Sequence, residues 1–225
     1  MVGIVSARFF TSLRAGLLGL AVLSGLTCAA QGPVVETHVL EIDPPTLRRI
    51  AVAPFLPSPK FKGDAPIGES SGGEAADAAA LTTRFVTEAF AAEGFDMVAA
   101  GDLVNVFAVS GKPVPHGEIG PFKRIAKDEY GATALLTGEV YRYKARQGGE
   151  FGATRSASVG FTVALHATSD GRELWRARFD KTQPTMSENL LEARRYPGGG
   201  ARWLTAAELA RWGARETAQR LLELK

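Results

Sequence analysis

The sequence predicts an α/β fold in which helices pack on one mixed β-sheet. Short apolar runs of strand length alternate with amphipathic stretches of helix length, and the second half of the chain is rich in strands. The 225 residues are 45% hydrophobic and 22% charged, which excludes a disordered or collagen-like chain and leaves room for one well-packed domain. The expected order over residues 49–225 is strand, helix, strand, two helices, three strands and helix.

The first strand and helix are marked by their ends. Residues 49–55 form a short apolar run that contains Pro54, which predicts a buried strand. Residues 57–73 are rich in proline, glycine and serine, which predicts a loop. Residues 75–93 carry apolar side chains at helical spacing, and Gly94 is a typical helix stop.

Three shorter elements follow. Residues 95–99 predict a second strand, and Asp102 is expected to cap a brief helix that ends at Phe107. Residues 111–120 predict a loop. A further helix is expected from Pro121 to Tyr130, because proline suits the first turn of a helix.

The second half alternates in the manner of strands. Residues 132–143 are apolar and then alternating, and the next strand has one apolar row: Val159, Phe161, Val163 and Leu165. Residues 169–171 contain Asp-Gly, which predicts a hairpin turn. After the turn, Trp175, Ala177 and Phe179 alternate with Arg176, Arg178 and Asp180, which predicts a half-buried strand. The link 144–158 is charged and glycine-rich, so we expect a polar hairpin tip and no membrane-spanning hairpin.

The last helix begins with a capping signal. Glycines 198–200 lead toward Thr205-Ala-Ala-Glu208, the pattern of a capping box. We expect the helix to bury an apolar stripe made of Leu209, Trp212, Leu221 and Leu222.

Residues 1–27 predict a cleaved export signal. Arg8 and Arg14 are its only charges, and the thirteen uncharged residues 15–27 are fewer than the roughly 20 that span a bilayer. Their removal lowers the count of basic residues from 26 to 24, equal to the 24 acidic ones. The mature chain is therefore neutral, which gives no reason to expect a nucleic-acid partner.

The single cysteine, Cys28, lies where a signal peptidase would cut. In bacterial lipoproteins a cysteine at this place carries a diacylglyceryl thioether and an amine-linked acyl chain such as palmitate, and several chains anchor stably. Gly25, Leu26 and Thr27 depart from the usual Leu-Ala/Ser-Gly/Ala pattern before such a cysteine. The alternative is ordinary cleavage after Ala30, which yields a soluble periplasmic protein. Residues 28–48 are expected to form an extended tether.

Candidate chemical groups are few. His38, His116 and His166 are not spaced for a metal site or a catalytic pair, and we expect no catalytic, cofactor-binding or metal-binding residues. One basic and aromatic cluster is a candidate partner surface, suited to phospholipid headgroups, peptidoglycan or an acidic protein edge: Arg194, Arg195, Tyr196, Arg202 and Trp203. The alternative is that this cluster is the rim of the core.

Three motifs occur in a familiar order: Ile50-Ala-Val-Ala-Pro-Phe55, Gly131-Ala-Thr-Ala-Leu-Leu-Thr-Gly-Glu-Val140 and Asp170-Gly-Arg-Glu-Leu-Trp175. Over residues 49–182 the chain resembles a group of bacterial envelope lipoproteins. The group includes the curli-secretion lipoproteins, the lipoprotein activators of penicillin-binding proteins and the amino-terminal domain of the Tol-system propeller protein. The resemblance implies an α/β sandwich with a role in envelope assembly or regulation and offers no catalytic residues. The long membrane hairpins of the curli channel are absent here, so a transport function is not implied.

These observations predict an exported, non-enzymatic lipoprotein. We expect anchoring through Cys28 on the periplasmic face of the outer membrane. What is known of such signals implies this membrane when the residue after the cysteine, here Ala29, is not aspartate. The partner would be an envelope protein or peptidoglycan. A second hypothesis is a soluble periplasmic domain that binds, or hydrolyses, a small ligand or sugar. A third is a homo-oligomeric secretion component.

Overall fold

A mixed sheet of seven strands forms the centre of the fold. The computed structural model describes residues 34–39, 47, 49–64, 72–183, 196–197 and 202–224. The strand order is β1-β9-β8-β5-β2-β4, with β3 also paired to β5. The strands are β1 Val34–Val39, β2 Arg49–Val52, β3 Leu56–Lys62, β4 Asp96–Val98, β5 Ala134–Lys144, β8 Ser158–Ala167 and β9 Glu173–Thr182.

The sheet joins a parallel part to an antiparallel part. Strand β2 pairs in parallel with β4 and β5, and β3 also runs parallel to β5. Strands β5, β8, β9 and β1 then pair antiparallel in that order. This arrangement confirms the predicted α/β fold with a mixed sheet.

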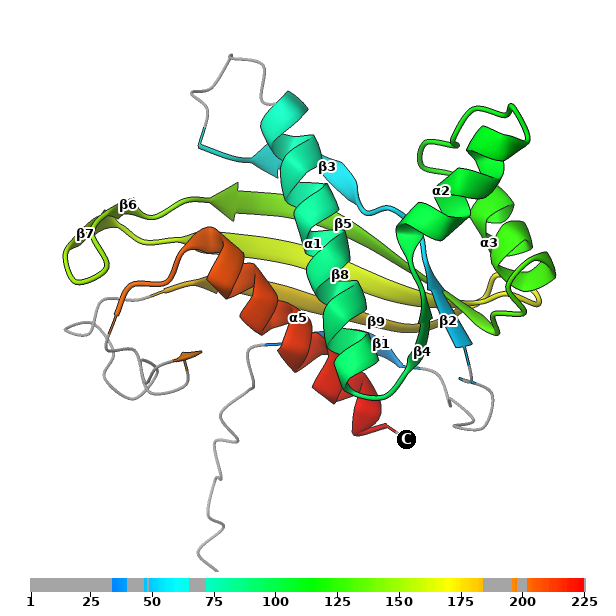
Figure 1. Cartoon of the computed structure of the whole chain (residues 1–225). Coiled ribbons are helices and arrows are strands. Elements are labelled where there is room, and N and C mark those ends of the chain that lie inside the picture. Colours follow the sequence, from blue (N-terminus) through cyan, green and yellow to red (C-terminus); the bar gives the residue numbers. More distant parts are fainter. Residues whose placement is uncertain are drawn as a thin grey trace, which may run out of the picture. The chain divides into compact units, whose positions relative to one another are not determined.

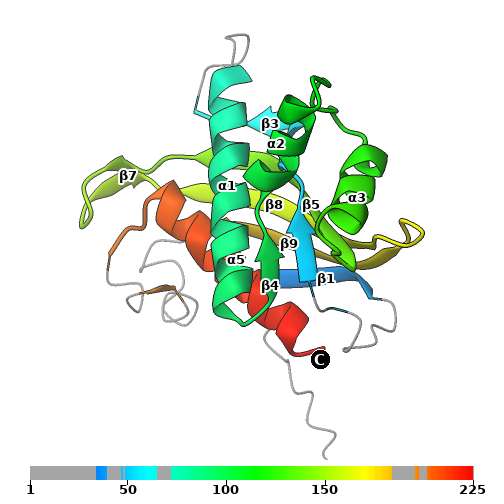
Figure 2. The same cartoon turned by 45° about the vertical axis from the view of Figure 1, so that its right-hand side comes forward.

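The described residues contain four helices: α1 Gly72–Ala92, α2 Ala100–Val109, α3 Ile119–Asp128 and α5 Ala206–Leu222. Helices α1 and α5 lie side by side across one face of the sheet (Figures 1 and 2). Helices α2 and α3 pack against each other, and both contribute residues to a second core cluster.

The larger core lies between the sheet and helices α1 and α5. Every residue of the apolar row predicted on β8 is buried, and so are Trp175, Ala177 and Phe179 of β9. The ring of Phe179 stacks on Phe161 at 5.3 Å between centroids and meets Trp212 of α5 edge-on at 5.7 Å. The predicted inward-facing rows of both strands are therefore confirmed.

A smaller core lies on the opposite face, under α2 and α3. Phe107 of α2 and Phe122 of α3 meet edge-on at 5.2 Å, and Ala51 of β2 and Leu135 of β5 belong to the same cluster. In the part of the chain that the structure describes, this cluster contains no residue of β8 or β9. The face of β8 and β9 turned away from α1 and α5 is therefore not covered by the second pair of helices.

The glycines at residues 94 and 171 and the capping box of α5 act as expected. Gly94 ends the α1 segment with φ of +85°, and Gly171 turns the β8–β9 hairpin with φ of +83°, a backbone region that favours glycine. At the start of α5 the backbone N–H of Glu208 donates to Thr205 Oγ1 at 3.2 Å. The N–H of Thr205 donates to the Glu208 carboxylate at 2.8 Å, so the capping box is complete.

Two segments expected outside the sheet are strands. Residues 34–39 fall within the expected tether 28–48, but they form β1 and pair antiparallel with β9. Residues 57–62 fall within the expected loop 57–73, but with Leu56 they form β3 beside β5. Their prolines, Pro57 and Pro59, are tolerated because β3 pairs on one side only, with β5.

Two local predictions are also corrected. Asp102 is not the cap of α2; it occupies the third helical position, and its carboxylate accepts from the N–H of Ala99 at 3.2 Å. Leu222 is 37% exposed, whereas Leu221 is buried. Successive helical residues are about 100° apart, so neighbours cannot both lie at the centre of one buried stripe.

Candidate functional surface

Among the described residues, the face of β8 and β9 that α2 and α3 leave uncovered, together with the adjoining part of β5, is mostly polar. The strand register sets its side chains in cross-strand rows, with Thr137 beside Ala164 and Arg176, and Glu139 beside Thr162 and Arg178. We call this surface the polar face; its residues are Thr137, Glu139, Tyr141, Arg142, Thr162, Ala164, His166, Glu173, Arg176, Arg178 and Asp180.

A β-bulge concentrates two side chains at one end of the polar face. The register between β5 and β8 shifts between Val140 and Arg142, so Tyr141 is an extra residue without a paired partner. As a result, both Tyr141 and Arg142 reach the same carboxylate, that of Asp180 on β9. Sequence reasoning missed this site because the alternation of residues 132–143 does not reveal where a bulge occurs.

Asp180 is the centre of a hydrogen-bonded network. Its Oδ2 accepts from the Tyr141 hydroxyl at 3.0 Å and from Arg178 Nη2 at 2.6 Å, and its Oδ1 accepts from Arg142. Arg178 Nε donates to the Tyr141 hydroxyl at 2.8 Å, and its guanidinium lies 4.6 Å from the centre of the Tyr141 ring. Four side chains from two strands thus hold one another in place.

The charge states of this network follow from its contacts. Burial alone would raise the pKa of Asp180, but the hydrogen bonds from Arg178 and Arg142 outweigh it and hold that pKa below its usual value. Burial and the nearby Asp180 raise the pKa of the Tyr141 phenol above its usual value. At neutral pH the carboxylate is therefore charged and the phenol neutral, which suits recognition by fixed charges better than proton transfer.

His166 lies at the other end of the polar face and is 8% exposed. Its Nε2 is 3.1 Å from Thr137 Oγ1, and its Nδ1 has no hydrogen-bond partner within the described residues. Burial lowers the pKa of the imidazole. Beside it, Arg176 forms a two-point contact with Glu173 at 2.8 and 2.5 Å.

The other histidines do not extend this site into a metal centre. His116 lines a cavity next to α3, and the side chain of His38 lies outside the described residues. Within the described ranges there is no group of three or more His, Cys, Asp or Glu side chains placed to hold a metal ion.

Two cavities adjoin α3. The first has a volume of about 130 Å³, and its lining is mostly apolar, with His116 and Glu118 at its polar side. The second, of about 520 Å³, lies between α2 and α3 and has Lys112, Arg124 and Asp128 on its wall. Pockets for drug-sized ligands usually measure about 300–1,000 Å³, so the apolar cavity is small for a sugar.

The predicted basic and aromatic cluster is only partly a surface. Arg194 and Arg195 lie outside the described residues, as does Cys28. Tyr196 is 2% exposed, its ring lies 4.8 Å from that of Trp212, and its hydroxyl donates to the Thr182 carbonyl at 3.1 Å. Its side chain therefore belongs to the core and not to an exposed contact surface.

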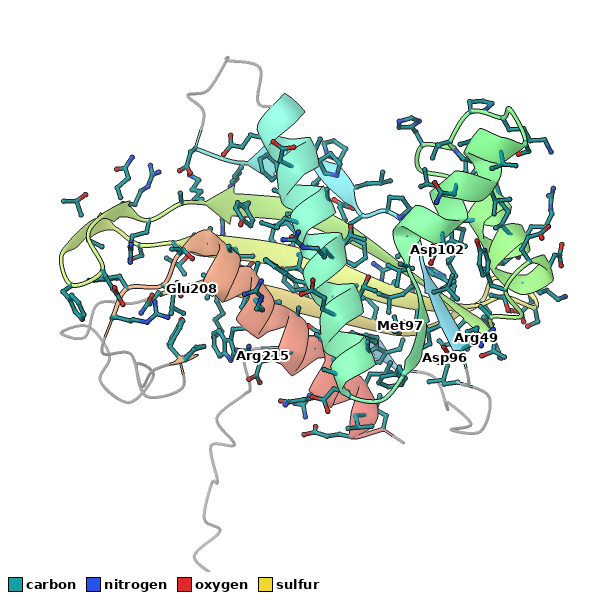
Figure 3. The ribbon with its side chains drawn as sticks, in the orientation of Figure 1. Arg49, Asp96, Met97, Asp102, Glu208 and Arg215 are labelled. Atoms are coloured by element: carbon teal, nitrogen blue, oxygen red, sulfur yellow. The ribbon has the colours of Figure 1, made fainter. Side chains whose placement is uncertain are left out.

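Arg202 and Trp203 are half-buried at the start of α5, next to the hairpin that follows β5. The guanidinium of Arg202 contacts Glu208 at 2.7 and 3.1 Å and Glu150 at 3.4 Å (Figure 3 labels Glu208). The hydrogen bonds from Arg202 lower the pKa of Glu208 to about 2. The N–H of Trp203 donates to the Glu150 carbonyl at 2.8 Å, which joins α5 to the hairpin.

The fold and its polar face define an α/β domain of the kind expected from the three motifs. No protein-family model and no curated protein matches the sequence. Similar solved structures do occur, and one is the PelC dodecamer from Paraburkholderia phytofirmans. It shares 15% identity with a TM-score of 0.41, and the match covers 82% of this chain and 95% of that one.

Two further neighbours have similar identity. Lipoprotein GNA1162 from Neisseria meningitidis is 18% identical with a TM-score of 0.36, over 60% of this chain and 80% of that one. The LpoB C-terminal domain from Escherichia coli is 14% identical with a TM-score of 0.34, over 60% and 82%. At such low similarity these neighbours assign neither a family nor an activity to this chain.

Proposed function

We propose that this chain is an exported lipoprotein, anchored through Cys28 to the periplasmic face of the outer membrane, whose domain binds an envelope protein without catalysis. The observation that carries the binding role is the polar face, a flat sheet surface of fixed charges over β5, β8 and β9. The anchor rests on the signal segment 1–27 and the placement of the single cysteine.

The composition of the polar face supports recognition of a protein. Three cations, Arg142, Arg176 and Arg178, alternate with three carboxylates, Glu139, Glu173 and Asp180. A surface of mixed sign selects a partner with the complementary pattern and repels others, whereas a surface of one sign attracts any opposite charge.

The polar face is also preorganised. Asp180 and Tyr141 are held by several hydrogen bonds each, so binding does not have to order them. Rigid side chains lose little conformational entropy on association. Arg178, whose side chain is 50% exposed, and the exposed Glu139 are the groups best placed to meet a partner.

Mass spectrometry of the membrane fraction tests the anchor. The expected mature chain begins at Cys28 and carries the mass of the diacylglyceryl and acyl groups. An unacylated chain beginning at Gln31 would contradict the anchor and favour the soluble periplasmic alternative.

Site-specific cross-linking tests the binding role. A photo-reactive residue at Glu139 on the polar face is compared with one at Glu88, which lies on α1 and is paired with Arg84. We expect a discrete adduct from position 139, lost when Arg178→Glu is added, and none from position 88. Adducts of equal yield at both positions, or none at position 139 in a normally exported chain, would contradict the proposal. Retention on isolated peptidoglycan, lost in the same variant, would make peptidoglycan the partner instead.

A further inference from the structure

An aromatic side chain lies exposed at the tip of a hairpin. Strands β6 (Gln147–Gly148) and β7 (Ala153–Arg155) form a separate two-stranded sheet between β5 and β8, as the predicted polar hairpin requires. Phe151 is in the turn between them and is 81% exposed. An exposed phenylalanine adds little to the stability of this domain, and its apolar ring is available for a contact outside it.

The hairpin is held in place rather than left free to move. The N–H of Trp203 donates to the Glu150 carbonyl, and Arg146 donates to the Trp203 carbonyl. On the other side, Arg155 pairs with Asp64. These contacts fasten the hairpin of β6 and β7, which lies at one end of the sheet (Figure 1), to its neighbours.

The chain enters the sheet at this same end. Strand β1 runs antiparallel to β9 with Val34 opposite Phe179, and β9 runs on from there toward Thr182. Thr182 pairs with Ser158, which in turn pairs with Lys144 at the base of the hairpin. Val34, the first described residue, therefore lies in the half of the sheet next to the hairpin that carries Phe151.

The length of the link to the anchor limits where the membrane lies. Six peptide units separate Cys28 from Val34, and six extended residues span at most about 20 Å. A lipid on Cys28 would therefore hold Val34, in the half of the sheet next to the hairpin, within about 20 Å of the bilayer, whereas the tether of 28–48 expected from the sequence would have allowed a much larger distance.

The side chains around the tip suit a lipid headgroup region. Lys144 and Arg146 flank the hairpin with positive charge, while Arg155 and Arg202 are balanced by Asp64, Glu150 and Glu208. Aromatic rings bind at the boundary between headgroups and acyl chains, and nearby Lys and Arg side chains bind anionic headgroups.

We propose that the hairpin is a second membrane contact, in which Phe151 enters the headgroup region of the bilayer that holds Cys28. This inference rests on the proposed lipid anchor. Together the two contacts would fix the orientation of the domain and turn its opposite end, at α2 and α3, toward the periplasm.

A fluorescent probe at position 151 tests this contact. Acylation consumes the only native thiol, so Phe151→Cys supplies a unique site for an environment-sensitive dye in the full-length lipidated protein. Val109→Cys is the matched control, because Val109 is an apolar residue that is 90% exposed on α2. Both proteins are reconstituted into phosphatidylethanolamine–phosphatidylglycerol vesicles, with and without nitroxide-labelled lipid.

We expect a blue-shifted emission, at least twofold brighter in vesicles, at position 151, with quenching by the shallow nitroxide, and neither effect at position 109. A dye at position 151 that emits as it does in water would overturn the inference. So would a blue shift that is already present in detergent and insensitive to nitroxide, which would indicate a protein contact. The mass of the unlabelled wild-type chain shows separately whether Cys28 is acylated, so failure of the anchor and failure of the hairpin contact are distinguishable.

Discussion

The hydroxyl of Tyr141 lies 3.0 Å from Oδ2 of Asp180, although the two residues belong to strands β5 and β9, which are separated by β8. The tyrosine side chain crosses β8 at Gly160. A Cβ atom at Gly160 would lie only 2.7 Å from Tyr141 Cζ, so this crossing requires a residue without a side chain. The hydrogen bond between Tyr141 and Asp180 therefore depends on Gly160, although Gly160 takes no part in it.

Gly160→Ala should destabilise the domain by about 1–3 kcal/mol, since the added methyl group displaces the Tyr141 ring. Urea denaturation followed by circular dichroism measures the change. Gly101→Ala is the control, because it lies in helix α2 with nothing within 4 Å of its added Cβ. The control should be neutral or gain up to about 1 kcal/mol from helix propensity. Equal behaviour of the two variants would contradict the role assigned to Gly160.

Trp175→Ala should cost about 3–5 kcal/mol, because the indole is fully buried in the larger core. The matched change at an exposed aromatic residue, Phe151→Ala, should alter stability by less than about 0.5 kcal/mol. Thermal and urea unfolding of both variants check this contrast. A small loss for Trp175→Ala would mean that the indole is not part of the core.

Thr205→Ala should cost about 1 kcal/mol through loss of the side chain that accepts the Glu208 N–H at the start of α5. Thr205→Ser keeps an accepting hydroxyl and should retain most of the stability. Unfolding midpoints of the three proteins measure the effect. An unchanged midpoint in the alanine variant would argue that the cap contributes nothing in this context.

His166 should make the domain less stable as the pH falls below neutral. Burial lowers the folded-state pKa of its imidazole, so near pH 6 the unfolded chain binds more protons than the folded one. Its contribution to stability is therefore complete above the unfolded pKa of about 6.5 and is lost as the pH falls through the lower folded-state value. Glu173 opposes the lowering of this pKa and Arg176 adds to it.

Unfolding free energies at pH 7.5 and pH 5.5 test this dependence. His166→Gln should show a smaller drop between the two values than the wild-type chain. An identical drop in the two proteins would exclude His166 as its source.

Local patterns predicted most of the elements because their causes are local. The row on β8 from Val159 to Leu165, the turn at Gly171 and the capping box at Thr205 each depend on residues a few positions apart. The resemblance of the three motifs to envelope lipoproteins stays a prediction, because no family model and no curated protein matches the chain.

The errors arise where pairing across the sheet overrides local preference. Residues 34–39 lie in a segment flanked by prolines and residues 56–62 contain two, but these segments become β1 and β3 because β9 and β5 offer edges to pair with. The arginines next to Tyr196 in the sequence predict a surface aromatic residue. Its ring instead packs against Trp212, which lies sixteen residues later.

By itself, the sequence determined the α/β class and the inward-facing rows of the main strands, because each is encoded in short-range order. Only the tertiary structure decided which sheet face stays open, that Tyr141 reaches Asp180 across Gly160, and that Val34 and Phe151 lie toward one end of the domain. These relationships depend on strand register and on a β-bulge, which arise from pairing between segments far apart in the chain.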